Sequence, residues 1–266
     1  MALVPEGEFL RGSTDAELDT LLKSRPDLKL TAFVDEQPAK TIYLDAFYID
    51  KYEVTVGQYR KFLAATGYPD PDWSLIRHFS LTDDHPITFV SWEDAVAYAA
   101  WAGKSLPTEA QWEKAARGGL EGKLYPWGDV LSHEQANYLG AGGRDLWDLT
   151  TSPVGSFPPN GYGIYDMAGN VIEWCLDWYE PTYYQYCPQE NPVNLTQTRY
   201  RTLRGGAWCF DDDGLRCGSR NLADALFRGG DREGFRCVLN VGPDTVSITP
   251  SGNLVTSWAS IKRQVN

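Results

Sequence analysis

Histidine and paired cysteines are scarce in this 266-residue sequence. Its three histidines, His78, His85 and His133, show no ligand spacing, and its five cysteines include no C-x-x-C pair. These absences argue against a structural zinc site and against a dithiol redox motif. The odd cysteine number favours a reducing compartment such as the cytoplasm, and leaves room for one disulfide, which could join Cys175 and Cys187.

Basic residues are also few, because 24 Lys and Arg stand against 36 Asp and Glu, a net charge of −12. Nucleic-acid binding needs clustered cations that neutralise phosphates, so no such partner is expected. The acidity suits divalent cations, or simply solubility. Long apolar runs are missing, and Pro5-Glu6 follows the first four residues at once. Neither a signal peptide nor a membrane span is therefore expected.

Turn residues and large aromatics, by contrast, are abundant. The 25 Gly and 16 Pro predict many turns and few long helices, and the 10 Trp and 15 Tyr supply large packing units with polar edges. A hydrophobic content of 42% is ample for a core. The pattern predicts one domain over residues 1–240, followed by a weakly patterned extension, 241–266, of unknown role.

Regular elements are predicted mainly in the first half of the chain. Apolar patterning predicts strands over 1–12, 42–49, 86–90 and 235–239. Helices are predicted after Thr55 and Ser91, and over 110–117, where Thr108 and Gln111 form a capping box and Gly118-Gly119 ends the helix. Residues 67–84 are predicted to be a loop.

Residues 120–160 show almost no periodicity, which is uncommon inside a compact domain unless something else holds the coil. Asn137, Asp145 and Asp148 lie in this stretch and carry hard oxygen donors of the kind that calcium prefers. The same residue types also form ordinary turns. These side chains could therefore bind a calcium ion or simply form turns, and the sequence leaves both interpretations open.

The stretch from Arg204 to Cys237 begins with Gly205-Gly206 before an aromatic residue and ends with Gly234-Phe235. Arginines recur in it at multiples of four, which would suit a helix, but the interspersed glycines argue against one. We therefore predict an ordered loop-and-strand surface, pinned by arginines that make buried hydrogen bonds to carbonyls and carboxylates. These arginines are Arg216, Arg220 and Arg236.

Many motifs in the chain resemble those of the formylglycine-generating enzyme (sulfatase-modifying factor) family. They include His85-Pro86-Ile87, Trp101-Ala102-Gly103-Lys104, Leu106-Pro107-Thr108-Glu109-Ala110-Gln111-Trp112-Glu113, Tyr125-Pro126-Trp127-Gly128, Gly169-Asn170-Val171-Ile172-Glu173-Trp174, Arg204-Gly205-Gly206 and Gly234-Phe235-Arg236. The resemblance covers roughly residues 1 to 240 in order. It implies an α+β fold of the C-type-lectin-like type, with small antiparallel sheets, two main helices and abundant coil.

The resemblance also implies two structural calcium sites. Asp166, Gly169, Val171 and Glu173 match one of them, with two carboxylates and two carbonyls across a tight turn. The other would begin with Asn137 and the Tyr138 carbonyl and continue with Asp148, or with Asp145, because the loop length differs here. The alternative for Glu173 is a buried carboxylate paired with an arginine.

The residues that carry catalysis in the family are only partly matched. Its enzymes oxidise a sulfatase cysteine with oxygen and copper, using two cysteines five positions apart after a Gly-Gly-Ser-aromatic segment. Here Ala207 replaces the serine, and the thiol after Cys209 is Cys217, eight positions on. Standard formylglycine-generating activity is therefore not expected. An oxidoreductase with copper held by Cys209 and Cys217 stays open as an alternative.

A related branch uses three histidines on iron together with an extra helical domain, and neither is evident here. Another branch of this fold binds ligands without catalysis and includes the variable proteins of diversity-generating retroelements. In that system asparagine codons cannot become Lys, Glu, Gln, Met or Trp codons, and residues 209–232 contain none of these five.

The favoured hypothesis is thus a non-catalytic protein that displays residues 208–232, as a surface that could be diversified, to a protein or other macromolecular ligand. Its apolar residues would form the centre and its aspartates the rim. The alternative is that the apolar residues pack inward. A third hypothesis is a non-catalytic subunit that regulates an enzymatic relative. The predicted contact residues are Trp208, Phe210, Asp211, Asp212, Asp213, Leu215, Leu222, Asp224 and Phe227.

Overall fold

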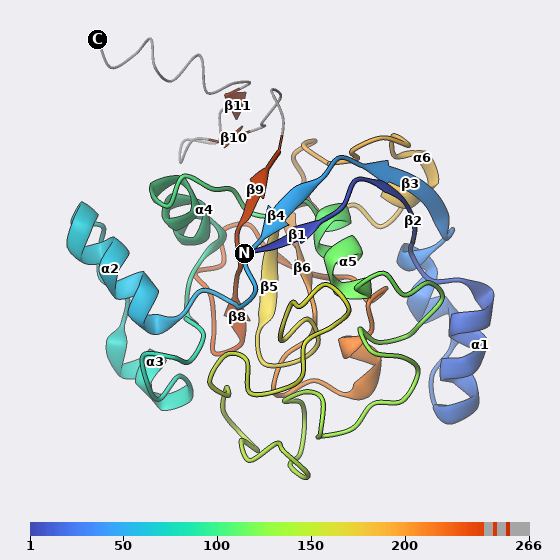
Figure 1. The fold of residues 1–266 in the computed structure, drawn as a ribbon, viewed down its shortest axis with the longest axis horizontal. Helices are drawn as coiled ribbons and strands as arrows, with labels where there is room; N and C mark the ends of the chain where they lie inside the picture. Colours follow the sequence, from blue (N-terminus) through green and yellow to red (C-terminus); the bar gives the residue numbers. More distant parts are fainter. Residues whose placement is uncertain (242–246, 249–253, 256–266) are drawn as a thin grey trace.

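The computed structural model describes residues 1–241, 247–248 and 254–255, and a four-stranded sheet lies at its centre (Figure 1). The strands are β5 (Ile172–Trp178), β6 (Tyr200–Arg204), β7 (Asn221–Asp224) and β8 (Glu233–Gly234), in the order β7-β6-β5-β8. The pairings of β6 are antiparallel, whereas β5 and β8 are parallel. β5 is buried over almost its whole length, as expected of an inner strand covered on both faces.

The N-terminal strands form two smaller sheets. β4 (Phe47–Ile49) lies between β1 (Ala2–Val4) and β9 (Val238–Asn240), and β2 (Gly7–Arg11) pairs with β3 (Lys40–Leu44). Each strand region predicted over 1–12 and 42–49 is thus divided into two strands, and Pro5, which cannot donate a ladder hydrogen bond, lies at the first division. A further pair, β10 (Ser247–Ile248) and β11 (Leu254–Val255), is antiparallel. The rest of the predicted extension lies outside the described residues.

The helices predicted after Thr55, after Ser91 and over 110–117 are present, and the described residues contain others besides. The helices are α1 (Asp15–Ser24), α2 (Val56–Thr66), α3 (Trp73–Phe79), α4 (Trp92–Trp101), α5 (Glu109–Arg117) and α6 (Tyr183–Tyr186), with 3-10 turns η1 (Leu30–Glu36) and η2 (Asp212–Leu215). Capping boxes begin α1, α2, α4 and α5, which confirms the predicted start at Thr108. None of these helices is long and apolar enough to cross a membrane.

Three local predictions were wrong. The stretch 67–84 contains α3, which Asp72 caps by accepting a hydrogen bond from the Ser74 amide. The stretch 86–90 makes only an isolated bridge to Thr55, because Phe89 has a left-handed backbone (φ 56°) that interrupts an extended strand. The strand predicted over 235–239 begins at Val238 rather than at residue 235.

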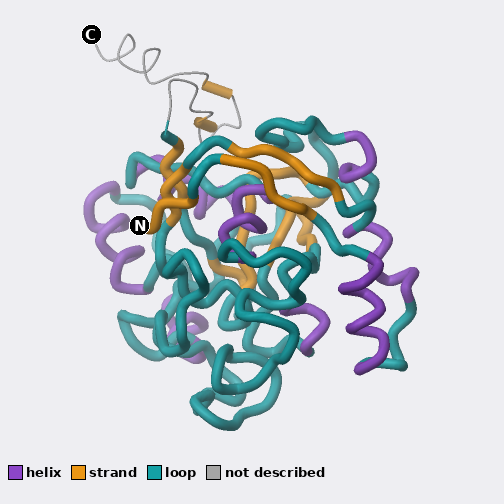
Figure 2. Tube along the Cα trace, turned by 45° about the vertical axis from the view of Figure 1, so that its right-hand side comes forward, coloured by secondary structure: helices purple, strands orange, loops and turns teal. Residues whose placement is uncertain are grey.

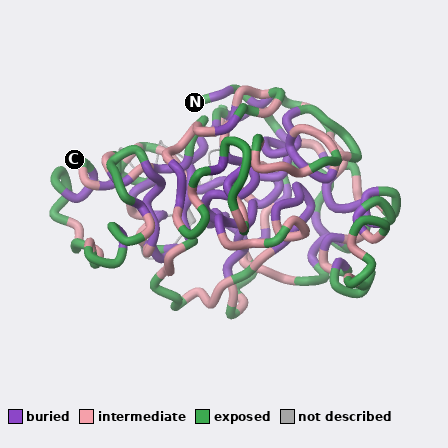
Figure 3. Tube along the Cα trace, turned by 90° about the horizontal axis from the view of Figure 1, so that it is seen from below, coloured by how far each residue is buried: buried purple, intermediate pink, exposed green. Residues whose placement is uncertain are grey.

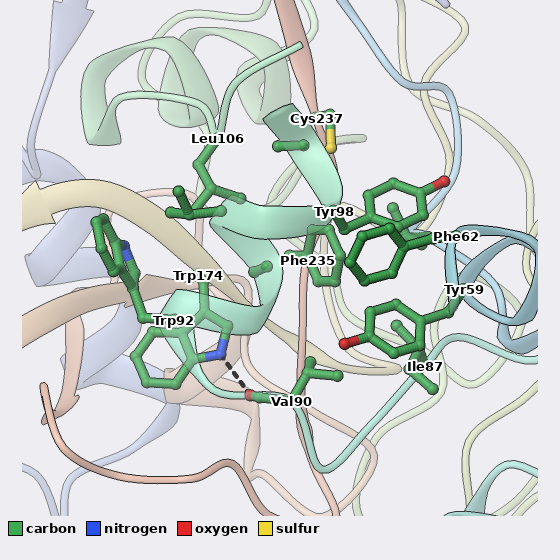
Figure 4. Packing of buried hydrophobic residues seen from close by; sticks show 14 of the residues in the cluster. Tyr59, Phe62, Ile87, Val90, Trp92, Tyr98, Leu106, Trp174, Phe235 and Cys237 are labelled. Atoms are coloured by element: carbon green, nitrogen blue, oxygen red, sulfur yellow. Dashed lines mark hydrogen bonds between the residues drawn. The ribbon is translucent and has the colours of Figure 1, made fainter. Parts of the chain in front are cut away.

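Aromatic side chains from α2, α4 and the central sheet form the largest core cluster (Figure 4). The rings of Tyr98 and Phe235 meet edge-on at 5.3 Å, and the rings of Phe62 and Tyr98 do so at 5.6 Å. The Trp174 indole N–H donates to the Val90 carbonyl at 3.0 Å. The aromatic abundance of the sequence is therefore used mainly for packing, with polar edges satisfied inside.

Between α5 and β5 the chain has no helix or strand, which confirms the predicted coil (Figure 2). Seen from below, exposed segments of the chain surround a buried interior (Figure 3). Side chains such as Asn160 hold the coil: its amide group donates to the Ala115 carbonyl at 2.7 Å at the end of α5. Hydrogen-bonded turns thus replace regular structure over this stretch.

Candidate functional site

A cleft of about 460 Å³ opens between η1 and the loop that follows β6. One wall comes from residues 32–36 and the other from residues 209–221, with Arg232 at the side. Its lining residues are Ala32, Phe33, Asp35, Glu36, Cys209, Phe210, Asp211, Asp213, Gly214, Arg216, Ser219, Arg220, Asn221 and Arg232.

Two buried arginines join the walls of this cleft. Arg216 Nη1 and Nη2 donate to Glu36 Oε2 and Oε1 at 2.8 and 2.7 Å. Arg220 Nε and Nη2 donate to the two Glu109 carboxylate oxygens at 2.7 and 2.9 Å, and its Nη1 reaches the Asp35 carbonyl. Bidentate charge-assisted pairs are strong and fix orientation. This confirms the predicted structural role of both arginines, and leaves their hydrogen-bonding capacity largely used.

Cys209 and Cys217 lie in different environments. Cys209 is half-buried and lines the cleft, and burial raises the pKa of its thiol, partly offset by Arg232. Cys217 is 1% exposed and belongs to the core cluster that contains Trp112 and Cys175, where burial raises its pKa to about 12. The cleft lining thus includes one sulfur atom and no histidine, so these residues do not fit a copper ion held by two thiolates.

All five cysteines are free thiols. The disulfide considered between Cys175 and Cys187 is therefore absent. Each of the two is fully buried, and they belong to separate clusters, Cys175 beside Trp112 and Cys187 beside Tyr183 and Tyr184. Burial in different parts of the interior keeps the two sulfur atoms from bonding.

The acidic run Asp211-Asp212-Asp213 beside the cleft is ion-paired at two of its residues and exposed to solvent at the third. Arg25, at the end of α1, forms ion pairs with Asp212 and, at 3.8 Å, with Asp213. Asp211 is exposed, and within the described part of the chain its carboxylate makes no hydrogen bond or ion pair. Asp211 therefore keeps its full capacity to accept hydrogen bonds at the mouth of the cleft.

The predicted contact residues do not all reach the surface. Leu215 is fully buried, and Trp208 is 7% exposed, with its ring stacked on Phe79 at 5.5 Å and its N–H donated to the Asp231 carbonyl. These two predictions were wrong, because both side chains fill core space. Phe210 is half-buried and lines the cleft.

The remaining contact residues lie on β7 and the turn after it. Leu222 and Phe227 are 42% and 39% exposed, and Asp224 is half-buried, where it accepts from Arg199 at 2.8 Å. Leu226, an apolar residue of the same segment that is not among the predicted contact residues, is 87% exposed.

Around the first implied calcium site, three carboxylates are buried together. Burial raises the pKa of Asp166 to about 6. Burial also raises the pKa of Glu53, as do the negative charges of Asp166 and Glu173. Glu53 was missed from the sequence, and it accepts from the Val171 amide and the Asn170 side chain. With Arg236 as the counter-charge, this group carries an excess of negative charge that a divalent cation would offset.

The individual ligands of this site fit a cation in part. Asp166 Oδ2 accepts from the Gly155 amide at 2.6 Å, but its buried Oδ1 has no hydrogen-bond partner among the described residues. Both Glu173 oxygens, in contrast, accept from Arg236, and one also accepts from Trp112 Nε1 at 3.0 Å. The contacts of Glu173 are therefore those of the alternative reading, a buried carboxylate paired with an arginine. Gly169 adopts φ 82°, with the Asn137 carbonyl where a Cβ would stand.

At the second implied site, Asp145 rather than Asp148 contacts Tyr138. Asp145 is 1% exposed, and its Oδ2 accepts from the Tyr138 amide at 3.3 Å and lies 3.0 Å from His133 Nδ1. Asp148 is exposed. Asn137 Oδ1 is buried without a partner among the described residues.

Each implied site thus contains one buried side-chain oxygen that has no hydrogen-bond partner among the described residues. These oxygens are Asp166 Oδ1 and Asn137 Oδ1. Within residues 1–241, no group of three His, Cys, Asp or Glu side chains converges as metal ligands. A calcium ion here would depend on carbonyl oxygens together with these two side chains, which is compatible with its usual ligand set.

Sequence comparisons find relatives of several kinds. A Chlamydia pneumoniae protein named serine/threonine-protein kinase pkn1 is 37% identical over 91% of the chain, although the chain spans only 38% of its length. The formylglycine-generating enzyme of Streptomyces coelicolor is 37% identical over 66% of the chain and 72% of the enzyme. The inactive C-alpha-formylglycine-generating enzyme 2 of Bos taurus is 40% identical over 60% of the chain and 52% of that protein.

Structural comparison agrees with the fold expected from the sequence. PvdO of Pseudomonas aeruginosa superposes with a TM-score of 0.73 at 29% identity, over 90% of this chain and 93% of PvdO. Variable protein 1 of Treponema denticola superposes with a TM-score of 0.69 over 91% of this chain and 95% of that one, and its 20% identity makes this a likeness of fold alone. The expected α+β, C-type-lectin-like architecture is confirmed. The model of the sulfatase-modifying factor enzyme 1-like domain matches residues 1–241, and the chain therefore belongs to the formylglycine-generating enzyme (sulfatase-modifying factor) family.

Proposed function

We propose that this protein is a non-catalytic member of its family that binds a protein or other macromolecular ligand. The binding surface would combine the cleft with the exposed part of residues 208–232. The observation that carries the proposal is that a single thiol, Cys209, lines the cleft, while Cys217 is buried in a separate cluster. Among the residues that the structure describes, the cleft lining does not offer two sulfur atoms that could share one copper ion.

The position before the aromatic residue supports the same conclusion. Ala207 is fully buried and has no hydroxyl group, so it cannot donate or accept a proton as a serine could there. The Cys209 thiol has a pKa raised by burial, and a raised pKa lowers the fraction of reactive thiolate at neutral pH. Thiol chemistry at Cys209 is thus disfavoured both by its environment and by the lack of a partner.

Binding is favoured by the groups that remain free on this surface. Leu226 is 87% exposed, and Leu222 and Phe227 of the same segment are 42% and 39% exposed. Exposed apolar side chains gathered in one segment are typical of interaction surfaces. Asp211 and the half-buried Asp224 supply polar groups around them. An apolar centre with a polar rim is the usual arrangement in a protein interface.

Bound calcium would stabilise the part of the fold that carries this surface. Members of the family bind calcium, and Asp166 and Asn137 each offer a buried oxygen without another partner in the described part of the chain. Bound calcium would supply a positive charge to the buried carboxylates. Asp166 and Glu53 would then stay ionised, and the coil that carries Asn137 would be fixed against β5.

A copper titration combined with a conversion assay tests the absence of the family's chemistry. Wild type, Cys209→Ala and Cys217→Ala would be titrated with Cu(I) against a chromophoric chelator, and incubated with copper, oxygen and a peptide that contains the sulfatase cysteine motif. We expect weak Cu(I) binding that neither substitution changes by more than about twofold, and no conversion of the peptide. Stoichiometric tight binding that is lost in either variant, or formation of formylglycine, would refute the proposal.

A display experiment tests the binding surface itself. A random peptide library would be selected on the wild-type protein, and the selected peptides measured on Phe227→Ala. Leu81→Ala is the matched control, because Leu81 is 54% exposed and lies outside residues 208–232. We expect the Phe227 change to weaken binding about tenfold and the Leu81 change to leave it unaltered. Selected peptides that bind all three proteins equally would exclude this face.

A regulatory role is the second candidate, favoured by the 40% identity to an inactive formylglycine-generating relative. In that case the ligand would be an enzymatic member of the family. Adding this protein to an active formylglycine-generating enzyme would then change its turnover, and an unchanged turnover at saturating concentration would exclude the role.

The proposed surface could also be diversified. Residues 209–232 lack the five residue types that adenine-directed mutagenesis of asparagine codons cannot produce. A near-copy of the coding segment next to a reverse transcriptase gene would support this reading. The absence of both would remove diversification and leave binding in place.

A further inference from the structure

A second groove, of about 450 Å³, lies between α2 and α3. It shares no residue with the cleft, and Figure 1 places α2 and α3 together at the left edge of the molecule, with α1 at the right. The lining residues are Arg60, Leu63, Ala64, Gly67, Tyr68, Asp70, Trp73 and Arg77. The groove plays no part in the proposed function.

The two helices present one face each to this groove. Arg60, Leu63, Ala64 and Gly67 recur at intervals of three and four along α2 and its C-cap, and therefore share a side of the helix. Gly67 adopts the left-handed conformation (φ 66°) that ends α2 and turns the chain back toward α3.

Two aromatic rings are held in place along the groove. The Tyr68 hydroxyl donates to Asp94 at 2.9 Å, and its ring packs on Phe62 at 5.1 Å. The Trp73 indole N–H donates to Asp70 at 3.0 Å. Both rings are thus anchored through their polar atoms, which makes the aromatic wall of the groove preorganised.

Two arginines, Arg60 and Arg77, line the groove of a protein with a net charge of −12. The guanidinium of Arg60 lies over the Trp73 ring at 4.8 Å and donates one N–H to Asp83 at 2.9 Å. A guanidinium has five N–H donors, so Arg60 keeps donors for a ligand. Arg77 is exposed and, among the residues that the structure describes, forms no ion pair or side-chain hydrogen bond.

Asp70 is the one carboxylate in the lining. Because it accepts the Trp73 N–H, its role there is to hold the ring. Arg60 is paired with Asp83, so Arg77 supplies the uncompensated guanidinium of the lining. Guanidinium groups match the oxygens of carboxylates and phosphates.

We propose that this groove is a binding site for a small anionic ligand whose phosphate or carboxylate group is attached to a flat ring. Arg77 and the free donors of Arg60 would bind the oxygens, and Trp73 and Tyr68 would contact the ring. Leu63 and Ala64 would form the apolar floor. The volume lies within the range of small-molecule sites.

Calorimetric titration with phenyl phosphate and, separately, with benzoate tests this site and distinguishes the two anions. Inorganic phosphate and phenol are the controls for each half of the ligand. We expect saturable binding of at least one ring-bearing anion, weaker binding of inorganic phosphate and no measurable binding of phenol. Binding should weaken as salt is raised, because exposed charge interactions are screened.

Two variants locate the binding, and one is the matched control. Arg77→Ala should weaken the affinity for the ring-bearing anion about tenfold, because it removes the unpaired guanidinium. Trp73→Leu should weaken the affinity for the ring-bearing anion more than the affinity for inorganic phosphate. Arg144→Ala is the control, since this arginine is 61% exposed and lies in the coil. Thermal unfolding of each variant shows whether it is folded.

The titrations would overturn the proposal in either of two ways. One is that neither ring-bearing anion binds the wild-type protein saturably. The other is that Arg77→Ala and Arg144→Ala, both folded, bind it as tightly as the wild type does. Neither outcome would contradict the proposed function, because that function depends on the cleft and not on this groove.

Discussion

Arg236 and Glu173 form a fully buried ion pair in which Nε of the arginine donates to Oε1 and Oε2 of the carboxylate at 3.0 and 2.8 Å, and Nη2 donates to Oε1 at 2.7 Å. The pair joins the loop before β9 to the central strand β5, and Arg236 Nη2 also donates to the Tyr165 carbonyl at 3.0 Å. One side chain thus connects the central sheet, the loop before β9 and the coil.

Arg236→Ala is expected to lower the free energy of unfolding by about 3–5 kcal/mol, because it leaves the Glu173 carboxylate buried without its counter-charge. Urea unfolding measures the loss. Arg228→Ala is the comparison, since Arg228 is exposed, and it should change stability by less than about 0.5 kcal/mol. Similar effects of the two substitutions would show that the buried pair contributes little.

Asp177→Asn is expected to change how stability depends on pH. Burial raises the pKa of Asp177 from 3.8 to about 7, although the amides of Glu109 and Asn194 donate to its oxygens. Because the folded pKa is raised, the folded state holds the proton more tightly. The contribution of this carboxyl group to the free energy of unfolding is fully present below pH 4 and is lost as pH rises through 7.

The slope from this single group is at most about 1.4 kcal/mol per pH unit. Urea midpoints at several values between pH 4 and pH 8 would show the wild type losing stability relative to Asp177→Asn as pH rises. A difference between the two proteins that is constant with pH would contradict the assignment.

Calcium is expected to raise the thermal stability of the wild-type protein after removal of bound metal with a chelator. The free energy gained grows with concentration and reaches about 2.7 kcal/mol at one hundred times the dissociation constant. Asp166→Asn should reduce this gain, because it removes a charged oxygen that has no other partner among the described residues. Asp148→Asn is the matched control, since Asp148 is exposed. An equal response in both variants would exclude Asp166 as a ligand.

Thiol labelling of the native protein is expected to modify Cys209 alone. Cys209 is half-buried at the cleft, whereas the other four cysteines are at most 3% exposed. The rate should increase with pH, because burial raises the pKa of the Cys209 thiol and the thiolate is the reactive form. Mass spectrometry after brief alkylation identifies the site, and early modification of Cys217 would contradict its buried placement.

The helix starts were predictable because their signals are local. Thr108 and Gln111, or Ser91 and the acidic residues after it, satisfy amide groups within one turn. The strand prediction at 86–90 failed because the left-handed backbone at Phe89 belongs to a contact with a distant segment, in which the Phe89 amide donates to the Gly230 carbonyl. No pattern within five residues encodes that contact.

The cleft was only partly predictable for the same reason. The sequence shows that Cys209 and Cys217 are eight positions apart, but not that one faces a cavity and the other the core beside Trp112. The arginine partners Glu36 and Glu109 lie more than a hundred residues away from Arg216 and Arg220. Glu53 was missed because it is isolated in the sequence and meets Asp166 only in the fold.

The short sheet formed by β1, β4 and β9 has a mechanical consequence. Ala2 pairs with Ile49 at one end of β4, and Asn240 pairs with Phe47 at the other. Tension applied at residues 2 and 240 would therefore draw the two outer strands along β4 in opposite directions. Such shear loads the inter-strand hydrogen bonds together, so the domain would resist stretching at its ends before its interior is strained.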